Sequence, residues 1–310
     1  MTVIVISGGL SHERDVSLRS GRQVAHSLRS LGHEVVVADV GQDLVGMISS
    51  APDPVVIPML HGGLGEDGAM AEVLQLLGVP FVGTGAPAAR ITFDKSIATS
   101  TAAAVGLRTP GQVALPSDIF RELGAAALMS GIGMRLGFPL MVKPSRSGSA
   151  LGTARVDEPE ALASALVAAY AYGPVAVIEE FVTGTELAVT VVDRADGPVA
   201  LAPVEIRPTS GIYDYEARYT AGATRFITPA EVSDEVLVAA KELALGAHRH
   251  LGLRHLSRTD MIVSDGEPVF LEANVAPGMT ETSLAPLAFE AEGLQIGEVF
   301  VGLIDLARGR

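Results

Sequence analysis

Residues 258–280 read RTDMIVSDGEPVFLEANVAPGMT. Two apolar runs flank the turn sequence Ser264-Asp-Gly-Glu267, and an Asp-Gly pair between such runs predicts a β-hairpin. Side chains two apart on a strand share a face, so Glu272 and Asn274 project together and the hairpin brings Asp260 opposite them. Taken alone, the polar face of a half-exposed hairpin explains these three residues equally well.

Three oxygen ligands without histidine or cysteine suit Mg²⁺, which keeps its other positions for water and phosphate oxygens. The surroundings of the hairpin favour this functional interpretation. Its second strand runs into a turn-rich segment that leads toward a helix, and such backbone can donate N–H groups to an oxyanion. The neighbouring residues that strengthen the prediction are Arg258, Pro277, Gly278, Ser283 and Leu284.

A second candidate site is the loop from Lys143 to Gly152, KPSRSGSALG. Glycine and serine let main-chain N–H groups approach phosphate oxygens closely, and Lys143 adds a positive charge. No Gly-Lys-Ser/Thr opens a helix here, so the loop is not a Walker A motif. On its own, this stretch fits an ordinary glycine-rich hairpin loop better than a phosphate site.

Three weaker signals could complete a nucleotide site. Lys95 offers a charge, and the run Ile178-Glu-Glu-Phe-Val182 could present backbone groups to an adenine edge. Glu186 follows shortly and could accept hydrogen bonds from ribose hydroxyls. None of the three is specific alone.

Near the N-terminus, Ser11-His-Glu-Arg-Asp-Val-Ser17 lies at a predicted strand-to-helix turn. Ser11 or Asp15 could simply cap the helix, whereas the functional interpretation gives Glu13 the task of holding a substrate ammonium group. The polar, aromatic segment Ser210–Tyr219 has the character of a lid that would exclude water from a phosphoryl intermediate.

Apolar periodicity divides the chain into three predicted modules, 1–94, 95–182 and 183–310. The first alternates strands and helices, which predicts a parallel sheet with ligand loops at the carboxyl ends of its strands, where Ser7–Gly9 and His61–Gly63 lie. The second is a small α+β unit around a strand–loop–strand, and the third combines β runs with a long helix. We expect strands at 3–6, 34–39, 55–60, 110–115, 139–143, 175–180, 186–192 and 199–206, and helices at 16–31, 66–77, 95–105, 159–171 and 231–251.

The composition of the chain argues against several classes of protein. The chain has 310 residues, 48% of them apolar, and its formal net charge of −14 argues against nucleic-acid and anionic-membrane partners. The absence of cysteine excludes disulfides, iron–sulfur clusters and cysteine nucleophiles. The start MTVIVISGG predicts a buried strand rather than a signal peptide, and Gly173-Pro174 interrupts the uncharged stretch 161–178. We therefore expect a cytoplasmic protein without a membrane segment.

Two further patterns are set aside. His248, His250 and His255 cluster near the end of the long helix, but no further ligand completes a zinc site, so a solvated helix end is the preferred interpretation. Ser7-Gly8-Gly9 lacks the full G-x-G-x-x-G fingerprint of dinucleotide-binding folds.

In this order the segments resemble the ATP-grasp superfamily and, within it, the D-alanine–D-alanine ligases. The resemblance covers essentially the whole chain and rests on Gly8-Gly9 with Ser11–Leu18, Leu60–Gly68, Phe93–Lys95, Lys143–Gly152, Tyr213–Tyr219, Arg258–Asp260 and Leu271–Thr280. It implies an α/β and α+β ATP-grasp fold with an N-terminal parallel-sheet domain. It also implies a ligase that phosphorylates the carboxylate of one D-alanine, which the amine of a second then attacks, releasing ADP and phosphate for peptidoglycan precursor synthesis.

The resemblance implies roles for individual residues. ATP would lie between the central and C-terminal modules, where its contacts would be Lys95, Lys143, Ser149, Glu179, Glu180, Phe181, Val182, Glu186 and Arg218. Two Mg²⁺ ions, or Mn²⁺ in their place, would be held by Asp260, Glu272 and Asn274.

The same resemblance implies the substrate contacts. Glu13 would bind the first ammonium and form a hydrogen-bonded set with Ser149 and Tyr219, while Arg258 and the Gly278 N–H would stabilise the oxyanion. The remaining substrate contacts would be His61, Ser283 and the Leu284 N–H, the last two on the second carboxylate. A homodimer is also expected from the family.

The chain departs from the family pattern at three positions. Arg218 stands where the family has a lysine, Phe93 replaces a methionine, and Ala276 stands where serine or threonine is common. None of these changes removes a catalytic group, but a guanidinium and an ammonium are not interchangeable beside a phosphate.

Three other functions are weighed against this one. A ligase of a specialised peptide pathway could carry the same motifs with other amino-acid substrates, whereas Tyr219 matches the dipeptide-forming type rather than a D-alanine–D-lactate ligase. A nucleotide-binding protein that has lost catalysis is disfavoured, because the residues that the reaction would need are all present. They are Glu13, Lys143, Arg258, Asp260, Glu272 and Asn274. An NAD-dependent oxidoreductase predicts cofactor binding that we do not expect.

Overall fold

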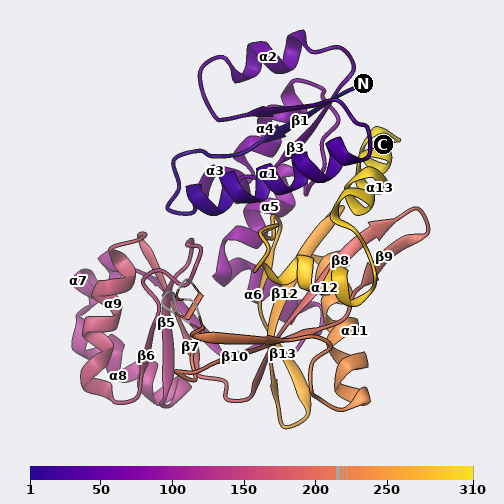
Figure 1. The fold of residues 1–310 in the computed structure, drawn as a ribbon. Helices are drawn as coiled ribbons and strands as arrows, with labels where there is room; N and C mark the ends of the chain where they lie inside the picture. The colour runs from indigo at the N-terminus through magenta and orange to yellow at the C-terminus, as the bar shows by residue number, and fades with distance from the viewer. Residues whose placement is uncertain (214–216, 219, 221, 310) are drawn as a thin grey trace.

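The computed structural model describes residues 1–309 apart from 214–216, 219 and 221, and three sheets organise it (Figure 1). The N-terminal sheet is parallel, with the order β2 (Val35–Ala38), β1 (Thr2–Ile6), β3 (Pro54–Pro58). Its helices are α1 (Arg14–Ser30), α2 (Leu44–Ser50), α3 (Gly63–Glu66), α4 (Ala69–Leu76) and α5 (Ala86–Phe93). The expectation of a parallel sheet at this end is confirmed.

One helix was expected over 66–77, and that prediction is wrong. The chain forms two helices, α3 and α4, because Gly68 between them adopts a left-handed φ of +86°. A Cβ at Gly68 would lie 2.5 Å from the carbonyl oxygen of Ala86, so the break also lets α5 approach closely. Helices α2 and α5 had no prediction from the sequence.

The central sheet is antiparallel and sits beside the larger C-terminal sheet (Figure 1). Helix α6 (Lys95–Ala104) leads into it, and its order is β4 (Gln112–Pro116), β7 (Val175–Glu180), β5 (Leu140–Pro144), β6 (Ala154–Val156). The remaining elements are α7 (Ser117–Leu123), α8 (Ala125–Leu136), η1 (Pro159–Ala161) and α9 (Leu162–Tyr170). Helices α7 and α8 were not predicted, and only Ile132 of α8 is fully buried, so the apolar periodicity there is weak.

The C-terminal sheet has the order β11 (Thr224–Ile227), β10 (Val204–Pro208), β8 (Thr185–Arg194), β12 (Leu256–Ser264), β13 (Glu267–Asn274), with β9 (Gly197–Ala200) paired to β8. Alternate residues of β8 face opposite layers, as the period of a strand requires. Val189 and Val191 pack with α11 (Asp234–His250), whereas Ala188 and Val192 pack with α12 (Leu284–Ala291) and α13 (Ile296–Arg308).

The single strand expected over 199–206 is wrong, because the chain forms β9 and β10 with a break between them. Pro203 falls in that break, and a proline has no N–H to donate to a strand ladder. The hairpin expected from Asp265-Gly266 is confirmed as β12 and β13.

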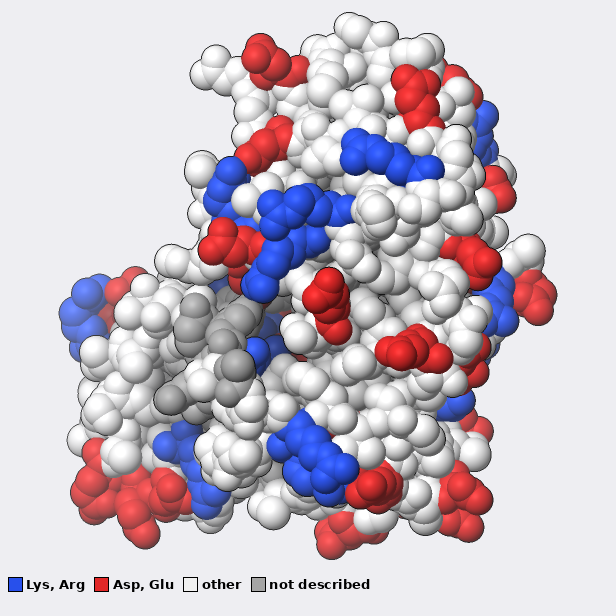
Figure 2. All heavy atoms as spheres, in the orientation of Figure 1, with Lys and Arg blue, Asp and Glu red and all other residues white. Residues whose placement is uncertain are grey.

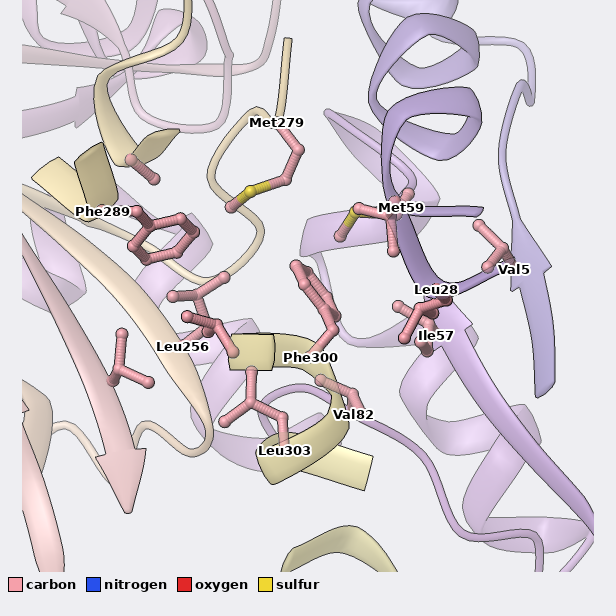
Figure 3. Packing of buried hydrophobic residues seen from close by; sticks show 14 of the residues in the cluster. Val5, Leu28, Ile57, Met59, Val82, Leu256, Met279, Phe289, Phe300 and Leu303 are labelled. Atoms are coloured by element: carbon pink, nitrogen blue, oxygen red, sulfur yellow. The ribbon is translucent and has the colours of Figure 1, made fainter. Parts of the chain in front are cut away.

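The C-terminal helix joins the first and third modules. Phe300 of α13 lies between Met279, Phe289 and Leu256 on one side and residues of the N-terminal module, including Met59 and Val82, on the other (Figure 3). One hydrophobic core therefore runs across the two modules, and burial of this apolar surface holds them together. The three sheets fall within the predicted segments 1–94, 95–182 and 183–310, and the boundaries themselves stay predictions.

The expected solvated histidine cluster is wrong for two of its members. His248 lies on the packed face of α11, where its Nδ1 is 2.7 Å from Ser257 Oγ and its Nε2 is 3.1 Å from Asp193 Oδ1. His255 is fully buried and its Nδ1 accepts a hydrogen bond from the Gly83 N–H. His250 alone is exposed. Across the described ranges, no three His, Cys, Asp or Glu side chains are grouped to hold a metal ion.

The described part of the chain contains no helix long and apolar enough to cross a membrane.

Candidate active site

Two adjoining cavities lie where the three modules meet. The larger, about 780 Å³, separates the central and C-terminal sheets, and the smaller, about 170 Å³, lies between α1, the β12–β13 hairpin and the start of α12. Lys95, Ser149 and Glu272 line both cavities, so the two chambers form one site. In the space-filling view, Lys and Arg side chains gather below the N-terminal module and into the hollow at the centre of this face (Figure 2).

Every predicted site residue that the structure describes lines one or both chambers. The larger chamber is lined by Lys95, Lys143, Ser149, Glu179, Glu180, Phe181, Val182, Glu186, Arg218, Asp260 and Glu272. The smaller is lined by Glu13, His61, Lys95, Ser149, Arg218, Arg258, Glu272, Asn274, Gly278, Ser283 and Leu284. Tyr219 lies outside the described residues, as does much of the segment expected to be a lid. The grouping brings the residues together, and their individual roles stay predictions.

Two lysines fix the glycine-rich loop, one at its start and one at Ser147 within it. Lys143 Nζ lies 2.7 Å from Glu179 Oε2 in a buried ion pair, and Lys95 Nζ donates to the Ser147 carbonyl at 2.7 Å. Ser149 and Ala150 take positive φ values of 51° and 56°, which turns the loop sharply at its tip. Both lysines border the larger chamber, where an ATP-sized ligand would bring its phosphates.

The edge of the larger chamber offers polar groups to a ligand. Glu179 Oε1 is buried and has no hydrogen-bond partner among the described residues, which leaves an acceptor available. Burial raises the pKa of Glu186 to about 8, with Asp260 and Glu272 adding to the shift and Arg218 opposing it. Apolar walls come from Met141, Ile262 and Leu271, which the sequence gave no specific signal for.

The predicted metal ligands meet across the hairpin as expected. Asp260 is the register partner of Glu272, and Arg258 that of Asn274. Arg258 forms a two-point ion pair with Asp260, with nitrogen–oxygen distances of 2.6 and 2.8 Å. Burial disfavours the charged guanidinium, but Asp260 outweighs it and raises the pKa of Arg258.

Glu272 completes this acidic cluster. Its Oε2 lies 3.1 Å from Lys95 Nζ. Burial opposes its charge, yet Lys95, Arg218 and Lys143 hold the pKa of Glu272 at about 2. The two carboxylates and the amide oxygen lie where the two chambers adjoin, and they match the oxygen donors that Mg²⁺ prefers.

The smaller chamber is tied to the phosphate loop through Glu13. The Ser149 hydroxyl donates to Glu13 Oε1, so the part of the expected Glu13–Ser149–Tyr219 set that the structure describes is present. Neither Ser11 nor Asp15 is the N-cap residue of α1, which is Glu13 and makes no side-chain cap bond. The Ser11 hydroxyl accepts from the Glu13 N–H at 3.2 Å and donates to the His61 carbonyl at 2.6 Å, while the Glu13 side chain lines the chamber.

His61 is held in place rather than left available. Its Nδ1 is 2.9 Å from the Ala276 carbonyl oxygen and its Nε2 is 3.0 Å from Ser20 Oγ. Burial lowers the pKa of His61, so the ring is neutral near pH 7. It fixes the turn after β13 against α1.

That turn carries the predicted oxyanion and carboxylate contacts. A Cβ at Gly278 would lie 2.7 Å from Ser283 Oγ, so only glycine allows this close approach without displacing the serine. Ser283 Oγ accepts from the Thr280 N–H at 3.0 Å, and Leu284 is the first residue of α12. The turn therefore presents backbone and hydroxyl groups at the chamber wall.

Sequence reasoning gave no site role to three titratable residues of the smaller chamber, Arg19, Glu66 and Tyr213. Burial raises the pKa of Glu66 to about 8, and the nearby Glu13 carboxylate adds to the shift. Glu66 and Tyr213 lie within stretches that carry the family resemblance, which was a usable signal. Arg19 lies one residue beyond such a stretch, and only the packing of α1 reveals its position.

Comparison with known proteins agrees with this geometry. Residues 103–305 match the family described as D-ala D-ala ligase C-terminus. A D-alanine–D-alanine ligase of Pelotomaculum thermopropionicum is 37% identical over 308 residues, which cover 99% of this chain and 96% of that protein. The chain belongs to the D-alanine–D-alanine ligase family. The ligase of Desulforudis audaxviator is 38% identical over 99% of this chain and 98% of its own length.

Solved structures agree over the whole chain. The VanG D-Ala:D-Ser ligase from Enterococcus faecalis has a TM-score of 0.86 at 26% identity, covering 99% of both chains. The D-alanine–D-alanine ligase from Bacillus anthracis, complexed with ATP, has a TM-score of 0.83 at 26% identity, covering 99% of this chain and 97% of that one. The expected ATP-grasp fold with an N-terminal parallel-sheet domain is confirmed, and so is the expectation of a ligase.

Proposed function

We propose that this chain joins two D-alanine molecules into D-alanyl-D-alanine at the expense of ATP, releasing ADP and phosphate for peptidoglycan precursor synthesis. The observation that carries the proposal is the junction of the two chambers. Lys95 and Glu272 border both, so a phosphoryl group in the larger chamber and a carboxylate in the smaller one meet there. That proximity replaces an unfavourable bimolecular encounter by reaction within one site.

In the first step, the carboxylate of the donor D-alanine attacks the terminal phosphorus of ATP, and ADP leaves. Lys95 and Lys143 neutralise the phosphates, while Glu13 holds the donor ammonium. Asp260, Glu272 and Asn274 would hold Mg²⁺, which spreads the charge of the transferring group when bound. The acyl phosphate so formed is a far better acyl donor than the carboxylate.

In the second step, the amine of the acceptor D-alanine attacks the acyl carbon and phosphate departs. Negative charge develops on the carbonyl oxygen, and Arg258 with the Gly278 N–H stabilises it. Asp260 keeps the guanidinium of Arg258 in place through both of its oxygens. The Ser283 hydroxyl and the Leu284 N–H contact the acceptor carboxylate.

Three finer statements belong to the same proposal. Two Mg²⁺ ions serve the reaction, with Mn²⁺ as a substitute, because the donor set contains only oxygen. The protein works in the cytoplasm, where ATP is present. It forms a homodimer, as expected from its family.

The test is phosphate release from ATP with Mg²⁺, measured across D- and L-amino acids singly and in pairs. The expected result is turnover with D-alanine alone, giving D-alanyl-D-alanine and ADP. Turnover only with another pair would move the enzyme to a specialised peptide pathway. ATP binding without turnover on any pair would overturn the proposal.

A second candidate acceptor is D-serine. The similarity over the full chain to a D-Ala:D-Ser ligase favours including it. Mixed incubations of D-alanine with D-serine, analysed by mass spectrometry, give the ratio of the two dipeptides. We expect D-alanyl-D-alanine to predominate.

A further inference from the structure

The smaller chamber has one wall whose proposed contacts carry no formal positive charge. The Ser283 hydroxyl and the Leu284 N–H are neutral, yet the acceptor amino acid brings a carboxylate there. Glu13 and Glu272 line the same chamber, and a carboxylate charge there repels that of the acceptor. A cation at this wall would offset the repulsion.

Most cations of the chamber are already engaged. Lys95 lies 3.1 Å from Glu272, and Arg258 is paired with Asp260 through two bonds. The guanidinium of Arg218 lies 4.3 Å from the centre of the Tyr213 ring. Lys95 and Arg218 also line the larger chamber, and the buried Nε of Arg218 has no hydrogen-bond partner among the described residues. None of these three side chains is exposed.

Arg19 is the exception. It lines the chamber and is exposed, and within the described part of the chain it forms no ion pair. Its one hydrogen bond is long, from Nε to the Asp15 carbonyl at 3.4 Å. The end of the guanidinium is therefore available to a ligand.

The geometry of α1 places Arg19 beside the acceptor wall. Glu13, Val16 and Arg19 follow one another at intervals of three, so they share one face of the helix, and all three line the chamber. A Cβ at Gly278 would lie 3.9 Å from Val16 Cγ1 and 2.7 Å from Ser283 Oγ, which puts Val16 against the turn. Ser20, next to Arg19, accepts a hydrogen bond from the Met279 N–H at 3.0 Å and fixes the same contact.

We propose that Arg19 binds the carboxylate of the acceptor amino acid beside the Ser283–Leu284 turn, and thereby selects acceptors with a free carboxylate. The inference rests on the proposed function, because it concerns the second substrate of that reaction. A guanidinium offers two parallel N–H groups to a carboxylate, which an ammonium does not. A bound acceptor would cover the exposed guanidinium and exclude water from it, which strengthens the ion pair between Arg19 and the acceptor carboxylate.

The test compares the wild-type protein with Arg19→Gln at saturating ATP and Mg²⁺. We expect the KM for D-alanine as acceptor to rise about tenfold or more, as for loss of a charge-assisted pair, while kcat falls less than about threefold. Formation of the acyl phosphate, followed by donor-dependent positional isotope exchange in ATP, stays unchanged. Arg19→Lys recovers part of the loss, because it restores the charge without the two-point geometry.

An acceptor without a carboxylate separates binding from structure. D-alaninamide offers the same amine, so Arg19→Gln and the wild-type protein use it equally well in the expected outcome. Arg22→Gln is the matched control, since Arg22 is exposed on the same helix but lines neither chamber. It leaves the acceptor KM unchanged.

Two results overturn the inference itself, and a third overturns the proposed function on which it rests. An unchanged acceptor KM in Arg19→Gln, or an equal loss with D-alaninamide, rules out recognition of the carboxylate by Arg19. Failure of the wild-type protein to form any dipeptide overturns the proposed function, and this inference falls with it. The two failures are distinguished by the wild-type reaction alone.

Discussion

Ser257 and Arg258 are neighbours on β12, and they serve two different polar clusters. Ser257 faces α11, where it bonds His248, which in turn bonds Asp193. Arg258 faces the smaller chamber, where it pairs with Asp260. Both clusters are buried, both join a carboxylate to a nitrogen-bearing side chain, and both involve residues of the same strand.

The difference between them lies in what surrounds the charges. Asp193 also accepts from the His255 N–H at 2.6 Å, so that cluster is closed by protein on all sides and lines none of the cavities described above. The Arg258 cluster adjoins two chambers and further ionised groups, Lys95 and Glu272. Burial of charge is thus common to structure and function, whereas access to a ligand marks the functional site.

The largest expected effect follows from breaking the Arg258 cluster. Arg258→Gln removes the proposed oxyanion contact and leaves Asp260 without its cation, so we expect kcat to fall about 10³-fold. Steady-state dipeptide formation measures it, and circular dichroism checks the fold. A loss smaller than tenfold in a folded variant would contradict the assigned role.

The matching change in the closed cluster affects stability instead. His248→Ala removes one of the hydrogen bonds to the buried Asp193 carboxylate, and we expect a loss of about 3 kcal/mol in the free energy of unfolding by urea. Activity of the remaining folded protein at low temperature stays within about twofold. His250→Ala, on the exposed side of the same helix, is the control and changes the free energy by less than about 0.5 kcal/mol. Equal effects of the two substitutions would refute the comparison.

The Asp193 carboxylate also predicts how the stability of the protein depends on pH in acid. Burial opposes the charge of Asp193, but hydrogen bonds from His248 and the His255 N–H hold its pKa at about 2. The folded pKa is below that of the unfolded chain, so this contribution is present above about pH 4 and is lost as the pH falls toward 2. Wild-type protein should lose more stability over that window than Asp193→Asn, as thermal unfolding at several pH values would reveal. Parallel curves would speak against it.

A smaller effect is expected where the two chambers are tied together. Ser149→Ala removes the hydrogen bond to Glu13, a bond to a charged group, and we expect kcat/KM for D-alanine to fall about tenfold. Ser147→Ala is the matched control, because Ser147 also lines both chambers but its hydroxyl makes no hydrogen bond to a described residue. Similar losses in both would indicate a general effect on the loop.

The remaining effect concerns Glu66 and has the opposite sign to that of Asp193. Burial and Glu13 raise its pKa to about 8 in the folded protein, so the unfolded chain releases a proton that the folded one keeps. Stability is therefore complete below the unfolded value and declines as the pH rises to about 8. Glu66→Gln should gain thermal stability relative to wild type between pH 5 and about 8. A difference independent of pH would exclude this titration.

The Arg258 cluster, with Asp260, Glu272 and Asn274, could be predicted from the sequence because its residues lie within one short stretch. Asp260, Glu272 and Asn274 lie on the two strands that flank an Asp-Gly turn, which predicts their proximity. Their register also depends on an irregularity between Asp260 and Met261, which pairs Asp260 with Glu272 rather than Leu271 and which the sequence did not predict. The phosphate loop between β5 and β6 was recognisable for the same reason. A site whose residues lie in one short stretch can be predicted without knowledge of the fold.

The cluster of Ser257, His248 and Asp193 could not be predicted in full, because Asp193 is distant from the other two residues in sequence. His248 continues the buried stripe of Ala240, Ala244 and Ala247 on α11, which was a readable signal for burial. Its partner Asp193 lies on another strand, and no local pattern links the two. Arg19 was missed in the same way, since its place at the chamber depends on how α1 packs against the turn after β13.

The central claim is that phosphoryl transfer and amide formation share one site, and labelled substrate tests it most directly. D-alanine carrying ¹⁸O in its carboxylate is incubated with ATP, Mg²⁺ and the protein, and the released phosphate is analysed by mass spectrometry. An acyl phosphate at the junction of the chambers predicts one ¹⁸O atom in each phosphate, matched by one D-alanyl-D-alanine. Phosphate without the label would mean that water, rather than the D-alanine carboxylate, receives the phosphoryl group, and would contradict the account.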